Sequence, residues 1–98
     1  MIINSAEQLE SIISSSISEV ETLLAEHPGF QPYLSIHRQL IAIREWTSDE
    51  IGLTKARTQS ITLGRITVHE LENNPDSRVA RLADALHGIN YYIKTQTP

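Results

Sequence analysis

The residues that most resemble a catalytic motif lie in the stretch TVHELENNP, residues 67–75. In a zinc protease, two histidines at positions i and i+4 project from one helical face onto the metal, and the glutamate after the first acts as general base. His69 and Glu70 match this pattern, but the second ligand position holds Asn73, and an amide binds zinc poorly. The sequence therefore predicts no metal site here. A small enzyme that uses His69 and Glu70 without a metal remains an alternative.

Other catalytic signatures are missing from the sequence. There is no cysteine, no glycine-rich phosphate loop and no G-x-S-x-G nucleophile motif. No two of the four histidines have the i, i+3 or i+4 spacing of a local metal pair. The sequence thus favours a protein that is not an enzyme and that needs no cofactor.

The distribution of charge is more informative than the net charge of −4. Residues 1–37 carry five glutamates and no lysine or arginine, whereas residues 38–98 hold seven acids and all eight bases. A surface of one negative sign repels phosphate backbones and anionic lipids, so we expect no nucleic-acid and no membrane partner. A basic protein partner would suit it. The alternative is an acidic surface that serves only solubility.

The length of 98 residues and the hydrophobic fraction of 40% predict one folded domain, residues 1–98. The longest apolar runs are only a few residues, and the start of the sequence, MIINSAEQLE, lacks the basic and apolar regions of a signal peptide. We therefore expect a cytoplasmic protein. The sequence gives no indication of whether the chain associates with itself.

Helix signals cover the first half of the chain. Ser5 and Gln8 have the spacing of a capping box, in which the serine oxygen accepts from the backbone and the glutamine reaches back to the cap. The apolar residues that follow recur at three- and four-residue spacing, which predicts one buried helical stripe. Pro28 ends this helix, and Pro32 suits the first turn of the next one.

The second half is harder to assign. The sequence TSDE, residues 47–50, is another helix start signal, but SITLGRITV at 60–68 is rich in β-branched residues that favour a strand. A single strand would lack a pairing partner, because every other apolar segment has helical spacing. We therefore predict a helix, bent near Gly64, where the missing side chain lets another helix approach. Asn74 and Pro75 suit the start of a last helix.

The predicted fold is all-α, a small four-helix bundle with helices over about residues 5–26, 32–46, 49–72 and 75–93. His69 and Glu70 then lie in the last turn of the third helix, where a histidine favours the helix dipole as readily as it binds a metal.

The runs HPGFQPYLSIHRQLIAIR and ITLGRITVHELENNPDSRVARLADAL resemble the small immunity proteins that accompany type VI secretion effectors, in particular those that neutralise an NAD(P)-degrading effector. The resemblance covers residues 28–86, and Thr67 departs from the small apolar residue expected at its position. The positions that carry the resemblance are Pro28, Gly29, Phe30, Gln39, Leu40, Ile43, Leu63, Gly64, Ile66, Val68, Glu70 and Pro75.

The resemblance implies an all-α immunity protein that binds a cognate secreted toxin domain and inhibits an NAD(P)+ glycohydrolase or another nucleotide-directed toxin by covering its cleft. A cleft that binds phosphates is cationic, and an acidic inhibitor complements it. The alternative is a helical adaptor or structural module without a toxin partner. The residues predicted to contact the partner are Glu7, Glu10, Glu21, Glu45, Asp49 and Glu50, with Trp46 as an anchor.

Overall fold

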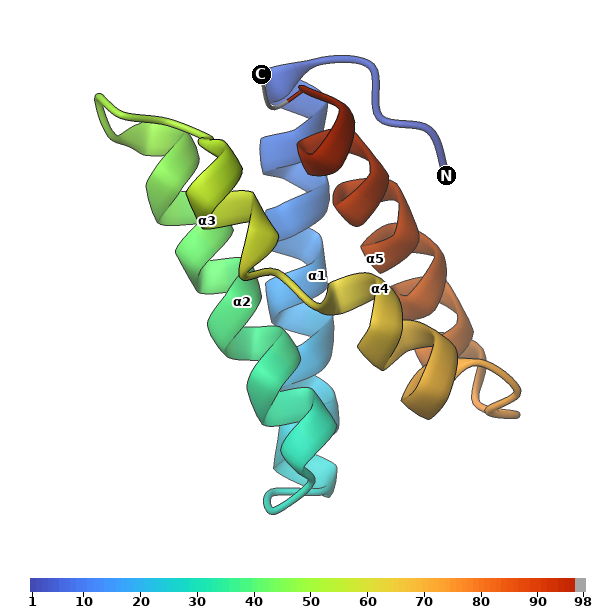
Figure 1. The fold of residues 1–98 in the computed structure, drawn as a ribbon. Coiled ribbons are helices and arrows are strands. Elements are labelled where there is room, and N and C mark those ends of the chain that lie inside the picture. Colours follow the sequence, from blue (N-terminus) through green and yellow to red (C-terminus); the bar gives the residue numbers. More distant parts are fainter. Residues whose placement is uncertain (97–98) are drawn as a thin grey trace.

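The fold of the chain is all-α in a computed structural model that describes residues 1–96 (Figure 1). No strand occurs among these residues. The elements, in chain order, are α1 (Ala6–Glu26), α2 (Gln31–Ser48), α3 (Lys55–Gln59), α4 (Leu63–Ile66), the π-helical turn η1 (Thr67–Leu71) and α5 (Ser77–Gln96). The all-α prediction is confirmed.

Helix α1 lies between α2 and α5, and both of these helices run antiparallel to it (Figure 1). The short α4–η1 segment packs against α5 and α2. The buried side chains form one continuous apolar core. The largest fully buried ones are Leu9, Ile13, Leu23, Ile36, Leu40, Ile43, Leu63, Leu71, Leu82, Leu86, Ile89 and Ile93. Burial of the apolar side chains of α1 offsets the weak helix propensity of the serines in this helix.

The start of α1 follows the predicted capping box. The Ser5 hydroxyl accepts from the Gln8 N–H at 3.1 Å, and the Gln8 side chain reaches back to accept from the Asn4 N–H at 2.8 Å. The serine half of the capping box is thus formed as predicted, whereas the glutamine bonds to the residue before the cap instead of to the cap itself. The predicted end near residue 26 and the start of α2 near Pro32 also agree with the structure.

The predicted third helix over residues 49–72 is wrong at its beginning. The sequence TSDE does not start a helix, since Thr47 and Ser48 belong to the last turn of α2. The Asp49 carboxylate instead accepts from the Gly52 N–H at 2.7 Å in a turn where Gly52 takes the left-handed conformation, φ +70°. The N-cap of α3 is Thr54, whose hydroxyl accepts from the Arg57 N–H at 3.2 Å.

The same predicted helix is also broken between α3 and α4, just before Gly64 rather than at it. Two side chains that are distant in the sequence form hydrogen bonds with the backbone groups at this break. The Gln39 amide oxygen accepts from the Thr62 N–H at 2.7 Å, and the amide nitrogen donates to the Thr62 hydroxyl at 2.9 Å. The Lys94 ammonium donates to the carbonyls of Thr58, at 2.6 Å, and Ile61, at 3.2 Å. Backbone groups that lose their helical partners are therefore satisfied from α2 and α5.

Gly64 allows the close approach that the sequence predicted. A Cβ atom at this position would lie 2.9 Å from the side-chain nitrogen of Asn90 in α5. Three residues further on, the buried Thr67 hydroxyl donates to the Leu63 carbonyl at 2.7 Å. A threonine is thus accommodated where a small apolar residue was expected, because its hydroxyl has a partner.

The last helix starts two residues later than predicted. Neither Asn74 nor Pro75 lies in α5, which begins at Ser77. The Asn74 side chain accepts from the Asp76 N–H at 2.9 Å, and the Asp76 carboxylate accepts from the Arg78 N–H at 2.9 Å. Asp76 therefore satisfies the first turn of α5, a role that the sequence analysis gave to Asn74.

Candidate partner-binding surface

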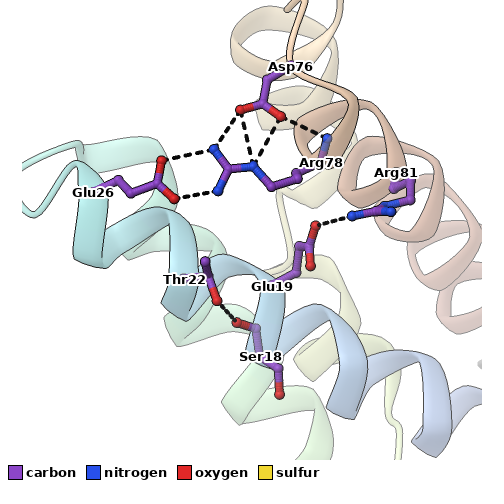
Figure 2. A network of polar contacts seen from close by, with 7 residues as sticks. All are labelled: Ser18, Glu19, Thr22, Glu26, Asp76, Arg78 and Arg81. Atoms are coloured by element: carbon purple, nitrogen blue, oxygen red, sulfur yellow. Dashed lines mark hydrogen bonds and ion pairs between the residues drawn. The ribbon is translucent and has the colours of Figure 1, made fainter.

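The five glutamates of α1 divide into two groups according to the helix that they face. Glu19 and Glu26 face α5 and form ion pairs with Arg81, at 3.2 Å, and with Arg78 (Figure 2). The other three point away from α5 and have no lysine or arginine partner among residues 1–96; they are Glu7, Glu10 and Glu21. The Glu21 carboxylate lies 3.2 Å from the His37 ring nitrogen of α2, whereas Glu7 and Glu10 have no ion-pair partner within residues 1–96. The outward face of α1 therefore keeps negative charge that no lysine or arginine of the described residues neutralises.

The Arg78 guanidinium joins the end of α1 to the start of α5 (Figure 2). It donates to both carboxylate oxygens of Glu26 and to both of Asp76, and the nearer Asp76 oxygen lies at 2.7 Å. The side-chain hydrogen bond from Arg78 lowers the pKa of Asp76 to about 2 and also lowers the pKa of Glu26. The two carboxylates in turn raise the pKa of Arg78. The network therefore stabilises the charged form of all three groups.

This network predicts a loss of stability in acid. Both carboxyl groups have a lower pKa in the folded chain than their ordinary values of 3.8 and 4.5, so the unfolded chain binds more protons below about pH 4.5. The stabilisation is fully present above that pH and is lost as the pH falls toward about 2. Replacing Arg78→Met should lower the midpoint of thermal unfolding at pH 7, and the difference from wild type should shrink at pH 2.5.

Thermal unfolding at constant ionic strength measures this effect. Arg44→Met serves as the control, because Arg44 is exposed and forms no ion pair within residues 1–96. A difference between wild type and Arg78→Met that stays constant from pH 7 to pH 2.5 would contradict the proposed linkage.

The end of α2 and the loop after it hold the second group of predicted contact residues. The Gly52 N–H, followed by the Arg57 guanidinium, lowers the pKa of Asp49, and the Arg57–Asp49 ion pair measures 2.8 Å. The guanidinium of Arg57 also lies 5.6 Å from the centroid of the half-buried Trp46 ring. Asp49 thus stabilises the turn of the loop, and Trp46, on the last turns of α2, packs against the Arg57 side chain.

The remaining predicted acids gather at one end of the molecule. Because α1 and α2 are antiparallel, the start of α1 and the end of α2 lie at the same end of the molecule, at the top of Figure 1, where the two helices diverge. Four exposed glutamates without an ion pair within residues 1–96 come from these two helix ends and from the loop after α2; they are Glu7, Glu10, Glu45 and Glu50. We call these four residues the acidic end. The exposed Ile51 side chain lies beside them in the sequence.

His69 and Glu70, the residues that resemble a zinc-protease motif, are both exposed on η1. Glu70 lines a hollow of about 220 Å³ with His27, Phe30 and Asn74, in which no His69 side chain takes part. Among residues 1–96, no group of three histidine, cysteine, aspartate or glutamate side chains is placed to hold a metal ion.

The sequence analysis missed the arginines of α5 as partners of α1. A signal for them exists in the spacing. Glu19 and Glu26 are two helical turns apart, and Arg78 and Arg81 are one turn apart, so each pair projects from one helical face. Antiparallel packing of α1 and α5 would bring the two rows together, but the sequence alone does not say that these helices are neighbours.

The structure is that of a small helical protein whose first helix presents an unneutralised acidic face. A model of the Tsi6 family matches residues 8–95, nearly all of the chain, and the chain belongs to this family of type VI secretion immunity proteins. Membership implies that the chain acts as an immunity protein and that its partner is a cognate toxin. No curated protein and no solved structure shows significant similarity to it.

The resemblance noted over residues 28–86 is confirmed at the level of the family, and the match extends it to most of α1 and to the second half of α5. None of the helices in residues 1–96 is both long and apolar enough to cross a membrane.

Proposed function

We propose that this immunity protein acts in the cytoplasm, where it inhibits a cognate secreted toxin domain that degrades NAD(P)+ or acts on another nucleotide. In this proposal the protein covers the active-site cleft of the toxin and performs no chemistry itself. The main support is the unneutralised charge on the outward face of α1. A cleft that binds a nucleotide attracts phosphates with positive potential, so the same potential attracts this face.

The contact surface in this proposal consists of the outward face of α1 and the acidic end. Glu7 and Glu10 belong to both, and Glu21 extends the surface along α1. Glu45 and Glu50 extend it to the end of α2 and to the loop that follows. The half-buried Trp46 adjoins Glu45 in the sequence, and the Asp49 carboxylate stabilises the loop that carries Glu50. Glutamates that already pair with arginine steer a partner less, because their field is largely cancelled at a distance.

The test uses the toxin domain encoded by the reading frame beside the gene for this chain. Co-expression of the two proteins should give a complex that survives purification. The isolated toxin domain should consume NAD(P)+ or another nucleotide, and addition of one equivalent of this chain should stop the reaction. If the two proteins do not associate, or if the toxin keeps its activity in the complex, the proposal is wrong. A complex with an unrelated protein would instead favour the adaptor alternative.

A further inference from the structure

The interface between α1 and α5 is bridged by ion pairs at one end and contains a groove in the middle. Glu26–Arg78 and then Glu19–Arg81 link the two helices along the C-terminal half of α1 (Figure 2). Beyond them the facing residues are small, Ser15 and Ser16 on α1 and Ala85 on α5, and a groove of about 210 Å³ opens between the helices. Its lining is completed by Met1, Ile12, Glu19, Arg81 and Leu82.

One residue that lines this groove has a buried polar atom without a partner. The Ser16 hydroxyl is buried, with 3% of the residue exposed, and it forms no hydrogen bond. A helical serine commonly donates to the carbonyl four residues earlier, here that of Ile12. That carbonyl already accepts from the Ser15 hydroxyl at 3.1 Å. A buried hydroxyl without a partner costs free energy, and a bound group that hydrogen-bonds to it would recover that cost.

The size and lining of the groove restrict what it can bind. Pockets for small-molecule ligands usually measure about 300–1,000 Å³, so this groove is too small for a nucleotide and suits a single side chain. Ile12, Leu82 and Ala85 provide apolar contacts, and Met1 adds a thioether, which packs well against aromatic rings. Arg81, whose side chain is 71% exposed, lies where its guanidinium can stack on a ring. These features fit an aromatic side chain with a polar tip.

The charge beside the groove indicates the residues that flank such a side chain. The groove opens along one edge of the outward face of α1, and this face carries Glu7, Glu10 and Glu21 without a lysine or arginine partner within residues 1–96. Ser11, Ser14 and Ser18 are exposed on the same side of α1 and present no bulky side chain. A partner segment can therefore lie across α1 with basic residues on the acidic face and its aromatic residue in the groove.

We propose that the α1–α5 groove is the anchor site for the toxin domain and that it takes a tyrosine from a basic segment of that domain, with the tyrosine hydroxyl bonded to Ser16. This inference rests on the proposed function and adds where and how the toxin is held. A buried aromatic anchor surrounded by charges is the usual arrangement of a protein interface whose affinity depends on few residues.

Two variants test the groove. Ser15→Trp fills it from its exposed lip and should weaken binding of the adjacent-frame toxin domain by about 30-fold or more, the loss expected when a main anchor is blocked. Ser16→Ala removes the unpaired hydroxyl; it should raise the midpoint of thermal unfolding by about 5 °C and weaken toxin binding about 5-fold. A change that stabilises the free protein and weakens the complex is not expected of a residue with a purely structural role.

The control is Ala80→Trp, which places the same side chain in the hollow on the other flank of α5, beside Asn73 and Asn74. This variant should bind the toxin domain as wild type does. Wild-type binding that persists in both Ser15→Trp and Ser16→Ala would overturn the groove proposal and leave the proposed function intact. Failure of the wild-type protein to bind would overturn both. If Ser15→Trp only converts a dimer of this chain into a monomer, the groove belongs to self-association and the proposal is wrong.

Discussion

Reversing the three outward charges of α1, Glu7→Lys, Glu10→Lys and Glu21→Lys, should weaken toxin binding by about 100- to 1,000-fold at low ionic strength and leave the fold intact. The positions are exposed, so the substitutions bury no charge. The change replaces attraction to a cationic cleft by repulsion, which acts mainly on the association rate. Rates measured by surface plasmon resonance at rising salt should converge with those of wild type, because ions screen the interaction.

The control for this prediction is Glu70→Lys with Glu72→Lys, two exposed acids in and just after η1, which packs against α4 and α5; Glu72 lies 2.8 Å from the His87 ring. Per charge reversed, this pair should affect the association rate much less than the α1 variant does. Equal effects would mean that only the net charge matters. An unchanged affinity of the triple variant at low salt would remove the α1 face from the interface.

Gln39→Leu should lower the free energy of unfolding by about 1–2 kcal/mol, the cost of leaving a partly buried donor without its acceptor. The Gln39 side chain satisfies both the N–H and the hydroxyl of Thr62 at the break between α3 and α4, and it also donates to Ser35 at 3.0 Å. Leucine has a similar size but no hydrogen-bonding group, so the Thr62 N–H would lose its acceptor. Urea unfolding followed by circular dichroism measures the loss.

Gln59→Leu is the matched control. Gln59 is exposed in α3 and forms no hydrogen bond through its side chain in the part of the chain that the structure describes, so this change should alter stability by less than about 0.5 kcal/mol. If Gln39→Leu is as stable as Gln59→Leu, the Gln39 side chain does not stabilise the backbone between α3 and α4. The result would also bear on why Gln39 is among the positions that carry the resemblance to the immunity family.

Local signals in the sequence are sufficient for the first two helices and for the class of fold. The Ser5–Gln8 capping box and Pro32 act through their own backbone neighbours, so a short window of sequence contains all the necessary information. The apolar spacing of α1 and α5 likewise depends only on helical geometry.

The broken third helix was beyond such reasoning. Gln39 and Lys94, the residues that satisfy the break, are 23 and at least 33 residues away from the groups that they bind. The same limit applies to the candidate interface. The acidic composition of residues 1–37 is visible in the sequence, but the structure alone separates the glutamates that arginines of α5 neutralise from those that remain available to a partner.

The packing of α1 against α5 has a consequence for when protection can begin. The α1–α2 hairpin consists of segments adjacent in the sequence, so it can form while translation continues. One wall of the groove, together with Arg78 and Arg81, belongs to α5 and is synthesised later. At about 5–20 residues per second, translation from α1 through α5 takes roughly 5–20 s. The acidic face of α1 is therefore synthesised before the groove can form. The protein can use both surfaces to bind its toxin only after α5 has emerged from the ribosome.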